Sequence, residues 1–458
     1  MAISVAIVGA GPAGFYTAEA LLESGADVRI DIIERLPTPF GLIRAGVAPD
    51  HQSTKQVARR FEQTALQALV DFFGNVEIGE VVTIEDLRAS YDAVVLAVGA
   101  GLDRPLGIPG ELLPGVYGSA LFVGWYNGHP DFRTLSPHLD TRAAVVIGNG
   151  NVALDVARVL VKSADEMATS DLPEEVGRAI RAGGIEDVYI IGRRGAADAR
   201  FTSVELREVG NLAECETLVD PDDVASSGDP GSDRQRRQSE RNLAILRGLA
   251  TFPRGVKPKR LHFRFNLTPV AIEGRRSVDA VRFERTRVVD GRLVGTGEFV
   301  RIACGLVIPA VGYRSFAIPG IPFDPARGLY PSTDGRIAPG LYAVGWAKRG
   351  PSGVIGSNRP DGEICAAQIA ADAAVQGFGE KPGRPAFEAC LRARGIRSLT
   401  FDDWRRIDAA EIAAATGPAP RRKFTDLAEM LALLAEDTRR IPAAAASMTA
   451  EAIPETAR

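Results

Sequence analysis

The chain has 458 residues and a mass of 48.7 kDa, with 45% hydrophobic residues, 24% charged residues, a net charge of −4 and a pI near 5.8. This composition is typical of a globular protein and excludes a disordered or collagen-like chain. The length favours two large domains or three smaller ones. Its apolar runs are far shorter than the roughly 18 residues of a membrane span, and no charged segment precedes the first run as in a signal peptide. We therefore expect a cytoplasmic protein without membrane insertion.

Four cysteines and four histidines are scattered along the chain. They are Cys215, Cys304, Cys365 and Cys390, and His51, His129, His138 and His262. Without a Cys-x-x-Cys pair, the cysteines predict neither a redox dithiol nor a zinc site, which argues against a thioredoxin-type disulfide reductase. No histidine pair has the spacing of metal ligands, so we expect no metal.

A Gly-rich turn follows the first predicted strand. Residues 3–8 form an apolar run typical of a buried parallel strand, the sequence Gly-Ala-Gly-Pro-Ala-Gly follows, and residues 15–24 have a helical pattern. In such a turn Gly9 permits the sharp bend, Gly11 lets the backbone approach a pyrophosphate, and Gly14 lets the helix pack against the sheet. The helix N-terminus then attracts the phosphates.

An acidic residue ends the second predicted strand. This strand covers residues 28–33, and Glu34 follows it, 20 residues after Gly14. Dinucleotide-binding sequences place a carboxylate there for the ribose hydroxyls. The first segment therefore predicts a dinucleotide site rather than an accidental Gly-rich turn.

A second strand, Gly-rich turn and helix occur near the middle of the chain. The strand is predicted at 144–147, the sequence Gly-Asn-Gly-Asn-Val-Ala follows at 148–153, and the helix is predicted at 154–161. Its final alanine is a permitted small residue. This segment predicts a second dinucleotide site.

The second site differs from the first in the charge at the end of its next strand. After an insertion with helical character at 172–182, the strand at 188–192 leads into Arg193 and Arg194. Two guanidinium groups can bind a 2′-phosphate, which a carboxylate would repel. The pair favours NADP over NAD, although a solvated arginine pair at a strand end is the alternative.

Unequal nucleotide sites suggest FAD in the first and NADPH in the second. Two apolar strands that end in glycine, at 91–99 and 304–312, mark where the chain would leave and re-enter an FAD domain. The expected fold is α/β, with two Rossmann-like dinucleotide-binding domains. The NADPH domain, residues 104–319, is inserted between the two parts of the FAD domain, residues 1–103 and 320–458, the second of which carries C-terminal helices.

A tryptophan and a Gly-rich loop follow the return to the first domain. Trp346 ends the strand predicted at 340–346, and the loop at 350–356 precedes a helical stretch at 362–375. Backbone donors and a helix N-terminus near the flavin pyrimidine would favour its anionic reduced form. Alternatively, Trp346 is an ordinary core residue and the loop an ordinary turn.

One stretch of the chain is strongly basic. Residues 231–264 contain ten Lys or Arg and two acidic residues, a net charge of +8 in a chain whose total is −4. Such asymmetry suggests a docking surface for an acidic protein. Nucleic acid is a weaker alternative because the stretch lacks interleaved aromatics, and a solvated helix face is the remaining one.

Several longer motifs carry a resemblance to a known family. They lie at residues 36–44, 46–51, 72–76, 148–155, 192–195 and 345–358. Through them the chain resembles the adrenodoxin-reductase type of ferredoxin:NADP reductase, and within it the stand-alone actinobacterial enzymes, from residue 3 to about residue 435. The resemblance does not extend to the alanine-rich tail after Arg440.

The resemblance implies specific cofactor contacts. For FAD these are Ala13, Glu34, Leu42, Ile78, Trp346, Gly353, Val354 and Ile355. For NADPH they are Arg104, Asn149, Gly150, Asn151, Val152, Arg193, Arg194, Glu205 and Gly353. It also implies an active-site ion pair between His51 and Glu208. From the residues alone a histidine in a Pro-Asp-His turn could equally be a structural cap, so a catalytic or a structural role stays open.

The resemblance implies a ferredoxin:NADP reductase. Hydride would pass from NADPH to FAD, and electrons would pass singly to an acidic, ferredoxin-like iron–sulfur protein docked on the basic stretch. Hydride transfer needs stacking geometry rather than a protein proton donor. The alternatives are an NADPH-dependent flavoenzyme that reduces oxygen or quinone and a non-catalytic dinucleotide sensor.

Overall fold

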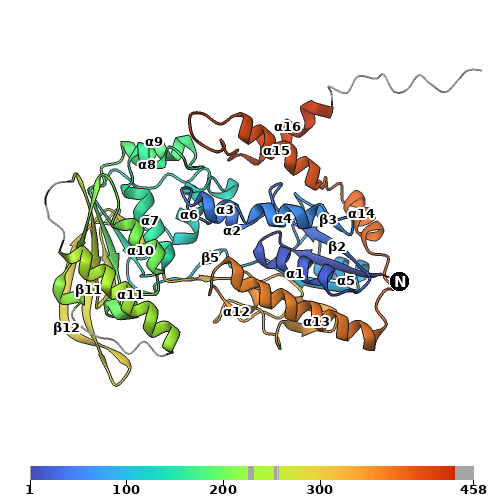
Figure 1. Ribbon diagram of the computed structural model, residues 1–458, viewed down its shortest axis with the longest axis horizontal. Helices are drawn as coiled ribbons and strands as arrows, with labels where there is room; N and C mark the ends of the chain where they lie inside the picture. Colours follow the sequence, from blue (N-terminus) through green and yellow to red (C-terminus); the bar gives the residue numbers. More distant parts are fainter. Residues whose placement is uncertain (1, 225–231, 252–254, 256, 439–458) are drawn as a thin grey trace, which may run out of the picture.

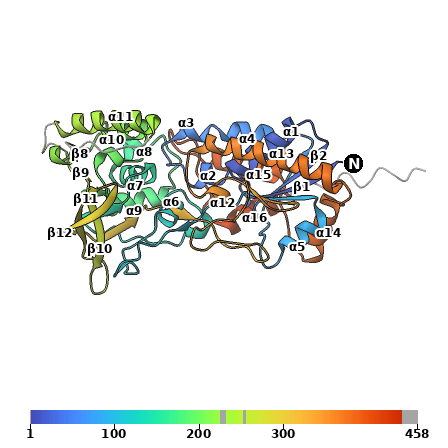
Figure 2. The ribbon, with the colours of Figure 1, turned by 90° about the horizontal axis from the view of Figure 1, so that it is seen from below.

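The computed structural model describes residues 2–224, 232–251, 255 and 257–438. Two lobes lie side by side along the long axis of the molecule (Figures 1 and 2). Parts of three predicted features lie outside the described residues. They are the alanine-rich tail, the ends of the proposed FAD domain at residues 1 and 439–458, and residues 231, 252–254 and 256 of the basic stretch. No helix in the described part of the chain has the length and apolar composition that a membrane crossing requires.

A six-stranded sheet forms the centre of the first lobe. Its strands are β1 (Ile3–Val8), β2 (Val28–Ile33), β3 (Val70–Phe73), β4 (Ala93–Leu96), β15 (Arg336–Ala338) and β16 (Leu341–Ala343). Their order is β15-β16-β4-β1-β2-β3, and all neighbours are parallel except β15 and β16. Because β4 pairs with β16, segments that precede and follow the second lobe share one sheet.

Helices cover both faces of this sheet, which explains why its central strands are apolar throughout. One face carries α1 (Pro12–Glu23), α4 (Ala58–Ala65), α13 (Arg359–Gln376), α15 (Phe401–Ala413) and α16 (Leu427–Thr438). The other carries α5 (Ile84–Ser90) and α14 (Arg384–Ala393). α1 and α13 approach closely, since a Cβ at Gly362 would lie 2.7 Å from the backbone oxygen of Tyr16.

A five-stranded parallel sheet forms the centre of the second lobe. Its strands are β6 (Ala143–Ile147), β7 (Asp187–Ile191), β8 (Cys215–Val219), β9 (Lys259–Arg264) and β13 (Leu306–Pro309). Their order is β13-β6-β7-β9-β8. A mostly parallel sheet in the first lobe and a parallel sheet in the second, each with a Gly-rich turn after its first strand, confirm the predicted α/β class.

The two faces of the second sheet are covered differently. One carries the helices α6 (Ser119–Tyr126), α7 (Asn151–Val161), α9 (Glu174–Ala182), α10 (Ser203–Val209) and α11 (Asp233–Ala250). The other carries an antiparallel sheet of β10 (Leu267–Glu273), β11 (Ala280–Val289) and β12 (Arg292–Ala303). Figure 2 shows α11 and this small sheet on opposite sides of the lobe. The sequence analysis did not predict the small sheet.

The two connections between the lobes lie side by side. β5 (Leu102–Asp103) on the outward connection pairs with β14 (Tyr313–Arg314) on the return, in antiparallel orientation. The proposed boundary at 103/104 falls at the end of β5, and the one at 319/320 follows β14. Both boundaries remain a proposal.

Helix starts differ from those expected. α1 begins at Pro12 rather than residue 15, and α7 begins at Asn151 rather than residue 154. In both, the second glycine of the turn is the extended N-cap residue, so the helix starts directly after it. The helix expected at 172–182 starts at Glu174, and the one expected at 362–375 is longer, at Arg359–Gln376.

Candidate active site

The Gly-rich turn after β1 is closed toward the protein and open at its centre. Gly9 has a φ of 111°, and a Cβ there would lie 2.5 Å from the carbonyl oxygen of Ala97. A Cβ at Gly14 would collide with the backbone oxygen of Gly9. At Gly11 no protein atom outside the adjoining chain lies within 4 Å of the position that a Cβ would take. This arrangement fits a pyrophosphate that approaches the start of α1.

Glu34 ties the end of β2 to this turn. Its Oε2 accepts a hydrogen bond from the backbone N–H of Ala10 at 3.0 Å, and its Oε1 accepts one from that of Leu36 at 3.2 Å. Burial raises the pKa of the carboxyl, and the two donors oppose this rise. The carboxylate is held at the edge of the turn, and its contact with a ribose stays a prediction.

The loop after β16 lies against the same turn. A Cβ at Gly345 would be 2.6 Å from the Cβ of Ala13. The next residue, Trp346, starts the short helix α12 (Trp346–Arg349) and donates from its indole N–H to the backbone oxygen of Ser352 at 3.1 Å. Trp346 is only partly buried, so it is not an ordinary core residue.

The remaining residues of the predicted FAD site differ in exposure. Leu42, at the start of α2 (Leu42–Ala45), is 44% exposed, and Val354 is 64% exposed. Gly353 has a φ of 85°, and Ile355 opens a short 3₁₀ turn (Ile355–Asn358) that leads into α13. Ile78 is instead buried in the core beside β3 and β4, and its contact with FAD stays a prediction.

The second Gly-rich turn repeats the pattern of the first. Gly148 has a φ of 147°, and a Cβ there would collide with the backbone oxygen of Ala310. At Gly150 a Cβ would meet no such atom within 4 Å. This turn also has room for a phosphate at the start of its helix, where Val152 is partly buried.

Two asparagines of this turn hold the segment that precedes α10. The backbone oxygen of Asn149 accepts from the N–H of Arg200 at 3.0 Å. The side-chain oxygen of Asn151 accepts from the N–H of Thr202 at 2.8 Å. The turn therefore positions α10, which carries Glu205 and Glu208.

Arg193 and Arg194 follow β7 at the edge of the second turn. Their backbone oxygens accept hydrogen bonds from Thr286 Oγ1 at 2.7 Å and from the N–H of Asn266 at 3.1 Å, respectively. Arg193 is exposed, and Arg194 lies 3.6 Å from Asp198. The backbone is anchored while both guanidinium groups reach solvent, as a 2′-phosphate site requires.

Arg104 lies at the connection between the lobes. Its Nε donates to the backbone oxygen of Tyr313 at 3.0 Å, and its Nη2 donates to that of Arg327 at 2.8 Å. Much of the guanidinium is thereby committed to holding the return connection. Its contact with NADPH stays a prediction.

His51, Glu205 and Glu208 meet between the lobes. His51 is the N-cap residue of α3 (Gln52–Lys55) in the first lobe, and its Nε2 lies 2.9 Å from Glu208 Oε2 and 3.4 Å from Glu205 Oε2 on α10. The predicted ion pair of His51 and Glu208 is thus formed across two lobes. Its role in catalysis stays a prediction.

The sequence analysis missed the buried charges beside this pair. Arg158 on α7 has a side chain only 1% exposed, lies 2.9 Å from Asp155 and 3.0 Å from Glu208, and also pairs with Asp50. Lys162 pairs with Asp50 at 2.6 Å. The signal was the spacing of Asp155, Arg158 and Lys162, which places three charges on one face of an otherwise apolar helix.

These contacts shift the proton affinities of the cluster. Burial alone would lower the pKa of His51, but the hydrogen bond that its ring N–H donates to Glu208 and the charge of Asp155 raise it overall. The bond with His51 lowers the pKa of Glu208. Burial raises the pKa of Asp155 to about 7, although His51 opposes this rise. The cluster can therefore take up or release a proton near neutral pH.

The same three side chains could offer ligand atoms to a metal ion, since those of His51, Glu205 and Glu208 lie within 4.8 Å of one another. However, the guanidinium of Arg158 already contacts the Glu208 oxygen nearest His51. A fixed cation therefore supplies the positive charge that a metal would bring.

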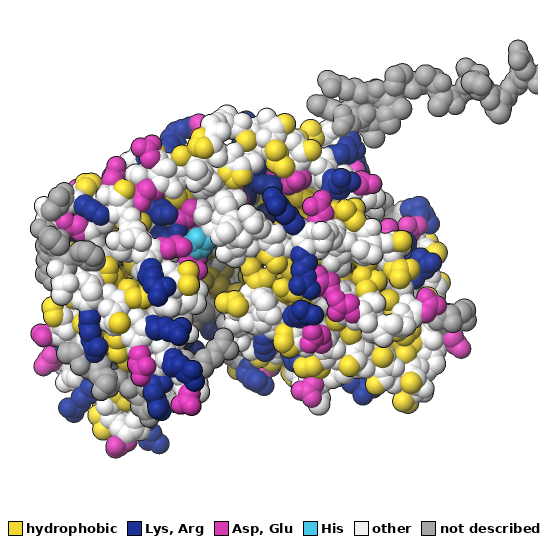
Figure 3. Space-filling model, in the orientation of Figure 1, with side chains coloured by type: hydrophobic (Ala, Val, Ile, Leu, Met, Phe, Trp, Pro, Cys, Tyr) yellow, Lys and Arg dark blue, Asp and Glu magenta, His cyan; other side chains and the backbone are white. Residues whose placement is uncertain are grey.

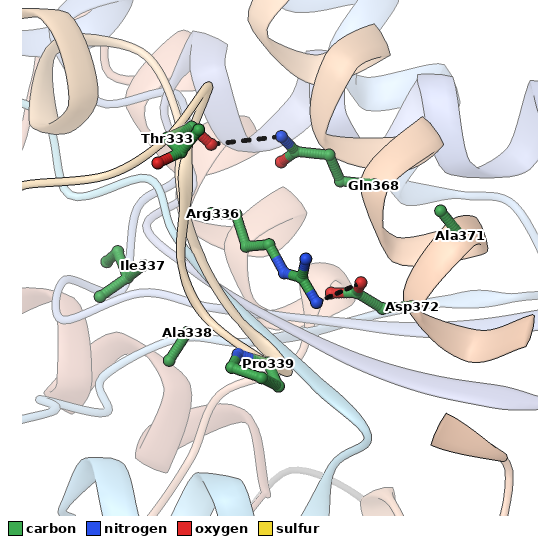
Figure 4. Close-up of a pocket in the computed structure, with 8 residues that line it drawn as sticks. All are labelled: Thr333, Arg336, Ile337, Ala338, Pro339, Gln368, Ala371 and Asp372. Carbon is green, nitrogen blue, oxygen red and sulfur yellow. Dashed lines mark hydrogen bonds and ion pairs between the residues drawn. The ribbon is translucent and has the colours of Figure 1, made fainter. Parts of the chain in front are cut away.

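Figure 3 shows the molecule hollowed between the two lobes. A separate surface pocket of about 540 Å³ lies away from both Gly-rich turns, between β15 and α13 (Figure 4). There Arg336 pairs with Asp372 at 2.5 Å, and Gln368 donates to the backbone oxygen of Thr333 at 3.3 Å. None of the residues that line this pocket belongs to either Gly-rich turn.

None of the four cysteines is disulfide-bonded. Burial raises the pKa values of the Cys215, Cys304 and Cys365 thiols to about 12. Thiols that stay protonated are weak nucleophiles.

Comparison with known proteins gives consistent matches. Residues 3–197 match the family model described as pyridine nucleotide-disulphide oxidoreductase. The chain is 41% identical to NADPH-ferredoxin reductase FprA of Mycobacterium tuberculosis over 93% of this chain and 98% of that protein. It is 40% identical to the mitochondrial NADPH:adrenodoxin oxidoreductase of Rattus norvegicus over 94% and 91%.

A solved structure of Mycobacterium tuberculosis FprA in complex with NADPH superposes with a TM-score of 0.90, at 40% identity, over 94% of this chain and 99% of that chain. Identity of this extent over nearly both full lengths, with the same fold, identifies the family. The chain belongs to the family of NADPH-ferredoxin reductases and NADPH:adrenodoxin oxidoreductases.

Proposed function

We propose that this chain is an FAD-dependent ferredoxin:NADP⁺ oxidoreductase, with FAD in the first lobe and NADPH in the second. The observation that carries the proposal is the pair of Gly-rich turns, each open at its second glycine, in lobes that the contact of His51 with Glu208 joins. Relatives named NADPH-ferredoxin reductase and NADPH:adrenodoxin oxidoreductase support it.

The reaction moves a hydride from NADPH to FAD, which oxidises NADPH to NADP⁺ and reduces FAD by two electrons. Bound FAD supplies the ability to accept electrons as a pair and to release them singly. The residues of the chain bind and orient the two dinucleotides. The Gly-rich turns take the pyrophosphates, Arg193 and Arg194 take the 2′-phosphate, and Trp346 with the loop at Gly353 borders the FAD site.

NADPH-driven reduction of the FAD-loaded protein tests this function, followed by cytochrome c reduction with and without a ferredoxin. We expect the flavin to be reduced by NADPH and cytochrome c reduction to depend on ferredoxin. If oxygen or quinone re-oxidises the reduced flavin and cytochrome c reduction does not depend on ferredoxin, the result would favour the oxygen- or quinone-reducing flavoenzyme. Bound FAD that NADPH does not reduce would favour a sensor.

We further propose that the partner is an acidic ferredoxin docked on the basic stretch at 231–264. Within it, Lys257 and Lys259 donate to backbone oxygens and Arg260 pairs with Asp187 at 2.6 Å, so these three hold the fold together. The exposed cations of the described side chains of α11 are Arg236, Arg237, Arg241 and Arg247. Arg254 lies outside the described residues.

Figure 3 supports a basic face, because Lys and Arg side chains gather over the part of the second lobe that holds α11 in Figure 1. An acidic partner would be steered to such a face, and its association would weaken with salt. We therefore narrow the proposed docking surface to the exposed side of α11.

We also propose a cytoplasmic location. The four cysteines form no disulfide bond, and free thiols are typical of a reducing compartment.

A further inference from the structure

The segment between α15 and α16, residues 414–426, extends from the first lobe to the second (Figure 1). α15 and α16 pack on the first sheet through Phe401, Trp404 and Met430. The loop between them reaches the side of the second lobe where α9 lies. We call residues 414–426 the strap.

The strap is anchored in the first lobe by a buried carboxylate. The side chain of Glu411 is 0% exposed and accepts from Arg44 Nη1 at 2.9 Å. It also accepts from the backbone N–H of Phe424 at 2.8 Å, while its own backbone oxygen accepts from that of Arg422 at 2.9 Å. Both ends of this loop are therefore fixed to α15.

Lys423 joins the strap to both lobes. Its side chain is 1% exposed. The ammonium lies 3.1 Å from the backbone oxygen of Arg44 in the first lobe and 3.1 Å from that of Asn127 in the second. It also lies 3.2 Å from Asp171 Oδ2 in the second lobe. One buried group thus contacts three separate segments.

Asp171 receives a second ammonium from the first lobe. Lys55 Nζ lies 2.7 and 2.9 Å from its two oxygens. Burying two cations around one carboxylate contributes little net stability, because desolvation offsets their attraction. Such directional contacts specify one arrangement of the parts that they join more than they stabilise it.

Further contacts surround Lys423 on the second lobe. Thr425 Oγ1 lies 3.4 Å from Glu175, and Arg133 lies 3.1 Å from Asp426. A Cβ at Gly128 would be 2.9 Å from both Thr425 and Pro173, so the strap contacts this lobe directly at Gly128. Both hydrogen-bonded or ion-pair contacts and van der Waals contacts therefore join the strap to the second lobe.

We propose that Lys423 is a positioning residue for hydride transfer: through the strap and Asp171 it holds the NADPH lobe in the orientation that brings the nicotinamide against the flavin. This inference rests on the proposed function. The reacting atoms must approach to about 3–3.5 Å, and a misplacement of about 1 Å costs about 100-fold in rate. Lys423 itself contacts none of the residues of the two Gly-rich turns, so it acts through orientation.

The test compares Lys423→Met with the wild type as FAD-loaded protein, by stopped-flow reduction with NADPH. Methionine fills the space while Asp171 keeps Lys55. We expect hydride transfer to slow by about 10- to 100-fold, with the Kd for NADP⁺ within about threefold because its site lies in one lobe. The deuterium isotope effect on turnover should rise, since the chemical step becomes limiting.

Amide hydrogen exchange gives a readout independent of activity. The backbone N–H of Asp171 donates to the oxygen of Pro49 across the lobes at 3.1 Å, and it should exchange faster in Lys423→Met. The control is Lys381→Met, since Lys381 donates to the backbone oxygen of Arg88 within the first lobe. It should match the wild type in rate and exchange.

Wild-type hydride transfer in a folded Lys423→Met protein with full FAD content would overturn the proposal. If that variant does not fold, the double variant Thr425→Ala with Arg133→Ala decides, because it removes only the peripheral contacts. We expect it to slow hydride transfer about threefold, and an unchanged rate would again overturn the proposal. Failure of the wild type to be reduced by NADPH would instead contradict the proposed function.

Discussion

At the contact between the lobes, the hydrogen bond with Glu208 and the charge of Asp155 raise the pKa of His51 against the effect of burial. Glu208 raises the histidine pKa and has its own pKa lowered by the same bond. The bond therefore stabilises the folded protein most between the ordinary pKa of a glutamate and the ordinary pKa of a histidine, and it weakens as the pH falls through the lowered pKa of Glu208. This contribution is lost as the pH rises through the raised pKa of His51.

Glu208→Gln should remove this dependence. We expect the pKa of His51 to fall, as measured by NMR titration of its ring. Because Glu208 is partly exposed, the free energy of unfolding should drop by only about 1 kcal/mol near pH 6 and by less at about pH 9. The matched control is Glu363→Gln, an exposed partner of Arg359. An unchanged titration of His51 would contradict the contact.

Arg193 and Arg194 should distinguish NADPH from NADH. Each charge-assisted hydrogen bond to a phosphate contributes roughly 1.5–3 kcal/mol. Arg193→Gln and Arg194→Gln should each weaken NADPH binding by about 10- to 100-fold and leave NADH binding almost unchanged, measured by the KM values for flavin reduction. Arg178→Gln, remote on α9, is the control. Equal losses for both cofactors would show that neither arginine binds the 2′-phosphate.

Among the elements, those built on local rules were predictable from sequence. The two Gly-rich turns follow from glycine at Gly9 and Gly148, where φ is positive and a neighbouring carbonyl excludes a side chain. The antiparallel sheet β10–β12 escaped prediction, although buried Val281 and Phe283 alternate with exposed Arg282. The cluster at Arg158 could be predicted only in part: the spacing of Asp155, Arg158 and Lys162 places charges on one helix face, but Asp50 and Glu208 reach them from distant segments.

The open centres of the two turns give a matched pair of substitutions. Gly11→Ala and Gly150→Ala place a methyl group where no protein atom outside the adjoining chain lies within 4 Å, so both proteins should fold. Gly11→Ala should lose FAD affinity, and Gly150→Ala should keep FAD and lose NADPH affinity, each by about tenfold or more. Fluorescence of released flavin and NADP⁺ titration measure these affinities.

Gly14→Ala is the contrasting variant, because its Cβ meets the backbone oxygen of Gly9. It should lower the free energy of unfolding by about 1–3 kcal/mol through overpacking. If Gly11→Ala bound FAD as tightly as the wild type, the pyrophosphate would not lie at this turn.

At the scale of the whole molecule, charge is distributed unevenly. The chain carries −4 in total, yet α11 presents exposed arginines on one side of the second lobe, and β11 lies on the opposite side. A partner that docks on α11 therefore meets a local positive surface on an acidic protein. This separation allows docking to be tested without disturbing either nucleotide site.

Reversing the charge of α11 should impair electron transfer to the partner and leave the reduction of FAD by NADPH unchanged. Arg237→Glu with Arg241→Glu should raise the KM for an acidic ferredoxin about tenfold or more at low salt. NADPH-driven reduction of ferricyanide should not change. Arg287→Glu on β11 is the control, since it adds the same kind of charge on the far side. Equal effects of both variants would argue against docking on α11.

The shared sheet of the first lobe has a consequence for biosynthesis. β4 pairs with β16, which follows it by about 240 residues in the chain. The first sheet therefore cannot be completed until the strands of the second lobe have been synthesised. Since domains fold as units during synthesis, the second lobe can fold while the first still exposes an unpaired strand edge. The lobe that contains the N-terminus is therefore synthesised first but is the last to complete its fold.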